Sequence, residues 1–135
     1  FLSDEADAAF MHGPTYMATP LACAAANASL DLFDSEPRLQ QVAAIEAQLK
    51  RELEPLRALP GVVDVRVKGA IGAVEVTELH DLDWLKAQFV EAGIWLRPFG
   101  KVIYTMPPFT ITSAELSAIT GAIAEILPRW AARKP

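Results

Sequence analysis

The sequence has little cysteine and histidine, and it has no long apolar run. Its single cysteine, Cys23, excludes an intrachain disulfide, and its two histidines, His12 and His80, lie too far apart to suggest a metal site. No apolar stretch approaches the ~20 residues that a membrane-spanning helix requires. The basic residues are scattered and the formal net charge is −5, which argues against a nucleic-acid-binding surface. We therefore expect a cytoplasmic protein with no metal, no nucleic-acid partner and no membrane contact.

The composition is typical of a folded domain. Apolar residues make up 52% of the chain of 135 residues, which is enough for one substantial core. Glycine and proline, with 7 and 10 residues, are too few for a disordered or collagen-like chain. Cys23 lies among alanines, so we interpret it as a small buried packing residue rather than a reactive thiol.

Four segments have the pattern of helices, and three of them lie in the first and last parts of the chain. Thr19 and Pro20 are a typical helix start, and the alanine-rich helix that follows should run to about Leu32 or Phe33. A second helix starts at residues 35–37, and Pro55 should kink or end it. One face of that helix carries apolar residues at spacings of three and four, namely Val42, Ile45, Leu49, Leu53 and Leu56. The run 112–115 is a capping box for the last helix, whose inward-facing residues are Leu116, Ile119, Ile123 and Ile126.

The middle of the chain has the pattern of strands. Apolar and polar residues alternate over 62–68, a turn follows at 69–70, and the returning strand should cover 71–77. Gly72 within this second strand indicates a bulge or a close approach of other groups to the backbone. A helix capped by Asp81 and ended by Gly93 precedes two further short strands at 94–96 and 102–105. We therefore predict an α+β fold, in which helices cover one face of a small and mostly antiparallel sheet.

The loop Gly13-Pro14-Thr15 is the first candidate site. It leads into the alanine-rich helix, whose N-terminus carries the positive end of the helix dipole. The Thr15 hydroxyl can donate a hydrogen bond to an anion, and Gly13 lets a ligand come close to the backbone. On composition alone, an ordinary loop before a helix is the more economical interpretation.

Arg97 is the second candidate. It follows the apolar residues 94–96 and precedes Pro98, and its guanidinium can hold a carboxylate with two parallel hydrogen bonds. The alternative is an arginine paired with a structural aspartate or glutamate. Tyr104 and Phe99 could line the same cleft, although core packing is the more economical interpretation for both. We interpret His12 as structural and His80 as a solvent-facing loop residue.

These two segments resemble one family. The run from His12 to Ala26 and the run from Gly93 to Gly100 are similar to the cofactor-phosphate loop and the substrate-carboxylate segment of fold-type I, class III aminotransferases, which use pyridoxal 5'-phosphate (PLP). The similarity is greatest to the S-adenosylmethionine-dependent branch that serves biotin synthesis. The resemblance implies that Pro14 and Thr15 contact the cofactor of the neighbouring subunit in a homodimer. It also implies that Gly13 lies beside the substrate and that Arg97 binds the far carboxylate of 8-amino-7-oxononanoate.

The resemblance further implies that the chain is a C-terminal fragment. Residues 1–18 would be the end of the large domain, 19–35 an interdomain helix, and 36–135 the small C-terminal domain. No lysine of the chain lies in the glycine-rich strand-end setting that the family uses for its cofactor lysine, so we expect no catalytic residue here and an inactive fragment. Two alternatives remain open at this point: another class III aminotransferase acting on ω-amino acids, or a free-standing domain that binds a carboxylate or serves association.

Overall fold

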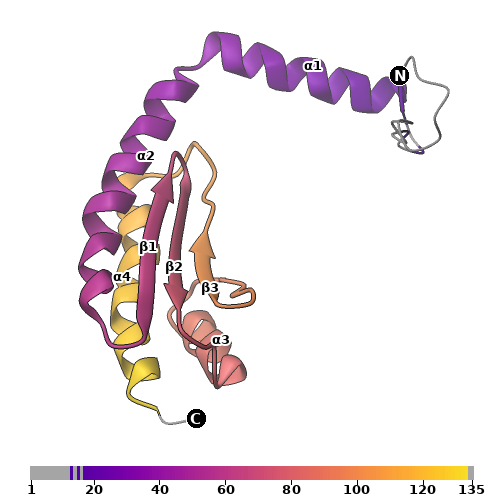
Figure 1. The fold of residues 1–135 in the computed structure, drawn as a ribbon. Helices are drawn as coiled ribbons and strands as arrows, with labels where there is room; N and C mark the ends of the chain where they lie inside the picture. The colour runs from indigo at the N-terminus through magenta and orange to yellow at the C-terminus, as the bar shows by residue number, and fades with distance from the viewer. Residues whose placement is uncertain (1–12, 14, 16, 134–135) are drawn as a thin grey trace, which may run out of the picture. The chain divides into compact units, whose positions relative to one another are not determined.

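The structure is a computed structural model that describes residues 13, 15 and 17–133. The chain divides into two compact units, 1–37 and 38–135, and each is described by itself. The elements, in chain order, are α1 (Pro20–Ser35), α2 (Arg38–Leu53), the 3-10 helix η2 (Glu54–Ala58), β1 (Val62–Lys68), β2 (Ile71–Val76), α3 (Leu82–Glu91), β3 (Val102–Thr105) and α4 (Ser113–Ala131) (Figure 1).

The sheet has three antiparallel strands in the order β1-β2-β3. β1 and β2 form the predicted hairpin, with Val65 opposite Val74, and a register shift lies between Val62 and Asp64. β3 pairs with the other edge of β2, where Ile103 lies opposite Val74. Every second side chain of β2 is buried, as the period-two pattern predicts for a sheet that is covered on one face.

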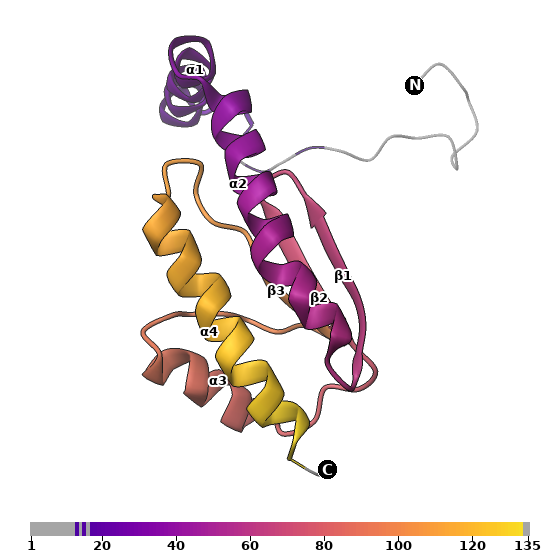
Figure 2. The same cartoon turned by 90° about the vertical axis from the view of Figure 1, so that its left-hand side faces the viewer.

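Helices α2 and α4 run side by side across one face of this sheet (Figure 2). Their apolar stripes and the inward side chains of the strands make one core, which confirms the predicted α+β fold with a helix-covered sheet. The largest fully buried side chains of this core are Phe89, Leu49, Leu53, Leu85, Ile103, Leu116, Ile123 and Leu127. Gly72 faces this core, and a Cβ placed on it would lie 2.8 Å from Leu53 Cδ1, so the predicted close approach is confirmed.

A polar network that the apolar pattern does not predict joins α2 to α4. Gln48 is only 7% exposed, and its Nε2 donates hydrogen bonds to the Ser113 carbonyl at 2.8 Å and to Ser117 Oγ at 3.0 Å. Thr120 donates to Glu52 Oε2 at 2.6 Å. Burial works to raise the pKa of Glu52, but hydrogen bonds led by the one from Thr120 outweigh it and lower that pKa. The network holds the start of α4 against α2.

Two local predictions are wrong. Residues 94–96 do not form a strand: they lie outside the three-stranded sheet, and the Ile94 N–H closes the end of α3 by donating to the Phe89 carbonyl. Asp81 precedes α3 but its side chain does not cap it. Asp81 instead adopts a left-handed conformation with φ 49°, and its carboxylate pairs with Arg133.

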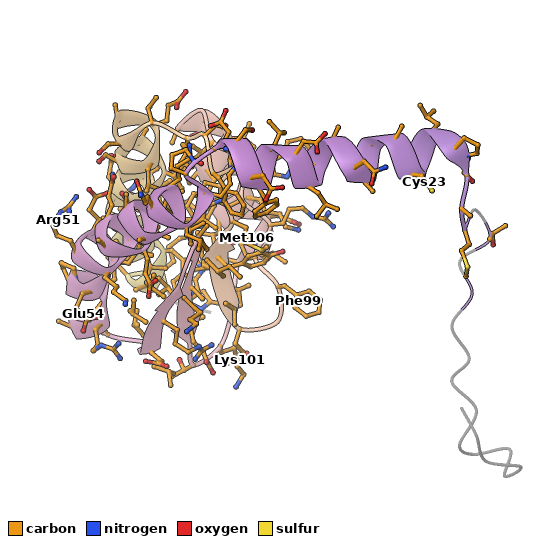
Figure 3. The ribbon with its side chains drawn as sticks, turned by 90° about the horizontal axis from the view of Figure 1, so that it is seen from above. Cys23, Arg51, Glu54, Phe99, Lys101 and Met106 are labelled. Carbon is orange, nitrogen blue, oxygen red and sulfur yellow. The ribbon has the colours of Figure 1, made fainter. Side chains whose placement is uncertain are left out.

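Helix α1 begins at Pro20 as predicted but buries none of its residues. Cys23 is therefore exposed, and its interpretation as a buried packing residue is wrong for this chain (Figure 3). The eleven residues 20–30 include no charged side chain, which is unusual for a helix that faces water on all sides. Among the described residues, none of the helices is both long enough and apolar enough to cross a membrane.

Candidate functional site

A cavity of about 310 Å³ lies beside β3, and Arg97 forms part of its wall. The irregular segment after α3 provides one side of this cavity, and the end of β3 with the residues after it provides another. Ile119 of α4 contributes a third side. The full lining is Ile94, Trp95, Leu96, Arg97, Tyr104, Thr105, Met106, Pro107 and Ile119. Most of these residues are apolar, and Arg97 is the one charged residue of the lining.

Arg97 makes no hydrogen bond and no ion pair within the part of the chain that the structure describes. Most other arginines of the C-terminal unit do: Arg57 pairs with Glu54 and Asp64, and Arg66 pairs with Glu75. The alternative of a structural acid as partner for Arg97 thus finds no support among these residues. An exposed guanidinium with all its donors available is suited to hold a carboxylate ligand.

Tyr104 lines the cavity together with Arg97, which from the sequence was the less economical alternative to core packing. It alternates along β3 with the buried residues Ile103 and Thr105, so it points to the sheet face that the helices leave uncovered. Its side chain is half-buried, and its hydroxyl makes no hydrogen bond to any other described residue. Met106 also lines the cavity but was not identified from the sequence. Its position two residues after Tyr104 was the available signal, because strand residues two apart share a face.

Phe99 and Trp95 project away from the core. Phe99 is 79% exposed and Trp95 82% exposed, so core packing is wrong for Phe99. Figure 3 shows Phe99 extending from the loop before β3, with Lys101 on the same loop. The backbone of Phe99 forms a bridge with Val102, which makes this loop a tight turn. Exposed aromatic groups beside an unpaired cation indicate a surface that another group covers.

The loop before α1 is described in part. Pro14 lies outside the described residues, as does His12. A Cβ on Gly13 would meet no atom within 4 Å, and Thr15 is exposed. The Thr19 side chain makes no capping hydrogen bond to α1. A hydroxyl and an open backbone that precede a helix N-terminus suit a phosphate group.

His80 lies in a different place from the one we predicted. Its ring stacks on Trp130 with ring centroids 4.4 Å apart, and its Nε2 atom is buried. His80 is therefore a packing residue of the α4 terminus rather than a solvent-facing loop residue. No group of three or more acidic, histidine or cysteine side chains that could hold a metal ion occurs among the described residues.

Comparisons with known proteins agree on one family. The family model described as aminotransferase class III matches residues 3–127. The adenosylmethionine-8-amino-7-oxononanoate aminotransferase of Corynebacterium glutamicum is 45% identical over 115 residues. That alignment covers 85% of this chain but only 27% of the relative, so the chain spans about a quarter of the relative's length.

Solved structures of transaminases share the fold. An (S)-enantioselective omega-transaminase from Thermomicrobium roseum matches 93% of this chain and 30% of its own, with a TM-score of 0.78 and 34% identity. An amine transaminase from an uncultivated Pseudomonas species, solved in a PLP-bound form, matches 89% of this chain and 30% of its own, with a TM-score of 0.73 and 32% identity.

Proposed function

Since the chain belongs to the class-III aminotransferase family, we propose that it forms the C-terminal part of an adenosylmethionine-8-amino-7-oxononanoate aminotransferase. The intact enzyme would transfer an amino group from S-adenosylmethionine to 8-amino-7-oxononanoate and give 7,8-diaminononanoate in biotin synthesis. The identity of 45% to a relative of that name supports this substrate pair. Because the chain spans only 27% of that relative, the remaining parts of the active site belong to polypeptide outside the chain.

The observation that carries the proposal is the unpartnered Arg97 in an apolar cavity. The acceptor substrate is a long aliphatic chain that ends in a carboxylate. Arg97 would hold this carboxylate through two charge-assisted hydrogen bonds, and the apolar lining would contact the methylene groups. The ligand would thereby be oriented by its far end, with its keto group directed away from Arg97.

PLP, when bound, supplies the carbonyl group that takes up and releases amino groups. We assign a hydrogen bond to its phosphate to the Thr15 hydroxyl, and a non-polar contact with the cofactor to Pro14, which has no N–H to donate, while Gly13 would lie beside the substrate. The donor set of this loop supports the assignment, and so does the PLP-bound transaminase of the same fold. In the family's arrangement this loop serves the neighbouring subunit, so we propose a homodimer.

The test is an amino-transfer assay of the complete protein in which this chain occurs. With PLP and 8-amino-7-oxononanoate present, S-adenosylmethionine should support formation of 7,8-diaminononanoate, detected by mass spectrometry. Thr15→Ala should weaken PLP binding, measured by titration of the cofactor absorbance, without changing the affinity for the acceptor substrate. A protein that binds PLP but yields no diamine with any amino donor would contradict the proposal.

A second candidate keeps the cofactor and changes the substrate. The structural match to an omega-transaminase, at 34% identity and a TM-score of 0.78, favours a class III enzyme that acts on ω-amino acids or amines. The assay separates the two candidates. Turnover with simple amines and pyruvate, and none with S-adenosylmethionine and the oxononanoate, would select this second function.

A further inference from the structure

Strand β1 lies at an edge of the sheet. Within the described part of the chain it pairs only with β2. Backbone groups of alternate residues in an antiparallel strand point toward opposite neighbours, so every second residue of β1 directs its N–H and C=O away from β2. The side chains of Asp64 and Arg57, rather than the backbone of β2, bond to the N–H and the C=O of Val65, which shows that Val65 is one of these residues. Val67, two positions further on, shares this orientation.

Arg57 and Asp64 bind the outward backbone groups of Val65, and we call this pair the Arg57–Asp64 clamp. Its Nη2 donates to the Val65 carbonyl at 2.5 Å, and its Nη1 donates to Asp64 Oδ1 at 2.6 Å. The same Asp64 oxygen accepts the Val65 N–H at 2.8 Å. Glu54 fixes the guanidinium from the other side, with 2.7 Å between Arg57 Nε and Glu54 Oε1. Both edge groups of Val65 are thus used by one ion pair rather than by a strand.

The space beside β1 is otherwise open. A groove of about 820 Å³ lies here, with Lys50 and Glu54 on the helical side, and with residues 65–68 of β1 and Ile71 and Ala73 of β2 on the other. An exposed edge strand of seven residues is a template for another strand unless charged groups obstruct it. Here the obstruction is concentrated at Val65, while Val67 keeps its outward N–H and C=O.

The sequence of β1 is complementary to itself. If two copies pair antiparallel with Val65 opposite Val65, Asp64 of each copy lies opposite Arg66 of the other, which gives two cross-strand pairs of opposite charge. The alternation of the strand also keeps the buried faces of both sheets on the same side. We propose that β1 is a latent pairing edge for a second copy of this chain, and that the Arg57–Asp64 clamp keeps it unpaired.

The test compares Arg57→Ala with the wild type in the complete protein, by sedimentation over a hundredfold range of concentration. The mass of the wild-type protein in this measurement is the baseline. Loss of the clamp should produce a species of twice the baseline mass whose fraction rises with concentration. Hydrogen exchange should show new protection of the peptide that contains residues 62–68 in this species. An unchanged mass, with native circular dichroism, would overturn the proposal.

Matched variants separate strand pairing from other association. Arg51→Ala also removes an exposed arginine with an ion pair, but Arg51 pairs with Glu52 of α2 and does not line the groove, so this change should leave the mass unchanged. Val67→Pro in the Arg57→Ala background removes an outward donor of β1 and should restore the baseline mass. Should Arg57→Ala not fold, Arg57→Gln takes its place with the same readout. Association that persists with Val67→Pro, or that Arg51→Ala also causes, would refute pairing through this edge.

Discussion

Replacing Gly72 by alanine tests how closely α2 packs on the sheet. The added Cβ would lie 2.8 Å from Leu53 Cδ1 and 3.3 Å from Leu49 Cδ2, both shorter than an ordinary van der Waals contact. Both leucines are fully buried in the core and have little room to move. Gly72→Ala should therefore destabilise the fold, although the backbone conformation at this position does not itself require glycine.

The expected magnitude follows from two opposing effects. Overpacking a core by one methyl group destabilises the fold by about 1–3 kcal/mol. Alanine also restricts the unfolded chain more than glycine does, which stabilises the fold by about 0.4–1 kcal/mol. The middle of each range, about 2 and about 0.7 kcal/mol, gives a net loss of about 1.3 kcal/mol in the free energy of unfolding. Urea unfolding followed by circular dichroism measures this loss, with the slope of the transition unchanged.

Gly121 on the exposed face of α4 is the matched control. A Cβ there meets no atom within 4 Å, so Gly121→Ala should stabilise the chain by up to about 1 kcal/mol through helix propensity. Combining Gly72→Ala with Leu53→Ala should cost less than the sum of the two single changes, because the smaller side chain makes room for the methyl group. If Gly72→Ala is as stable as the wild type, or if the two glycine variants behave alike, the packing argument is refuted.

Three further results are expected. Thr112→Ala removes the capping box with Glu115 and should cost about 0.5–2 kcal/mol in urea unfolding; no change would show that α4 does not depend on this cap. A hydrogen bond from Arg57 lowers the pKa of Asp64. The ionised Asp64 therefore stabilises the fold at pH values above its usual pKa of 3.8, and this stabilisation is lost as the pH falls through the lower pKa of the folded state. Stability of Asp64→Asn should therefore depend less on pH below that value than stability of the wild type, and parallel acid curves would contradict this. In the chain by itself, the exposed Cys23 should react with a thiol reagent as fast as a cysteine in a short peptide.

The periodic parts of the fold were predictable from the sequence. The alternation over 62–68, the apolar stripe of α2 and the capping box of α4 each follow from local spacing, and each formed as expected. The strand expected at 94–96 did not form: the Ile94 N–H is used to close α3, and these residues pair with no strand of the described sheet. Such pairing is non-local and leaves no mark in a short apolar run.

The key residue of the candidate site was predictable from the sequence, but the residues that surround it in space were not. Arg97 was identified from its chemistry and its neighbours in sequence, and the structure adds that Tyr104 and Met106 share its cavity. The polar network of Gln48 and Thr120 was missed. A helical stripe is identified from its apolar residues, so the pattern does not identify polar residues on the same buried face. His80 was misjudged because its stacking on Trp130 joins segments fifty residues apart in the sequence.

The most direct measurement of the central claim compares Arg97→Met with the wild type in the complete protein. The readout is kcat/KM for 8-amino-7-oxononanoate and for its methyl ester, which lacks the carboxylate charge. The wild type should prefer the acid, and Arg97→Met should reduce kcat/KM for the acid on the order of tenfold to a hundredfold and abolish the preference, because a hydrogen bond to a charged group contributes about 1.5–3 kcal/mol. Lys101→Met, an exposed cation of the same loop, should behave as the wild type. An Arg97→Met enzyme that still prefers the acid to the ester would contradict the account.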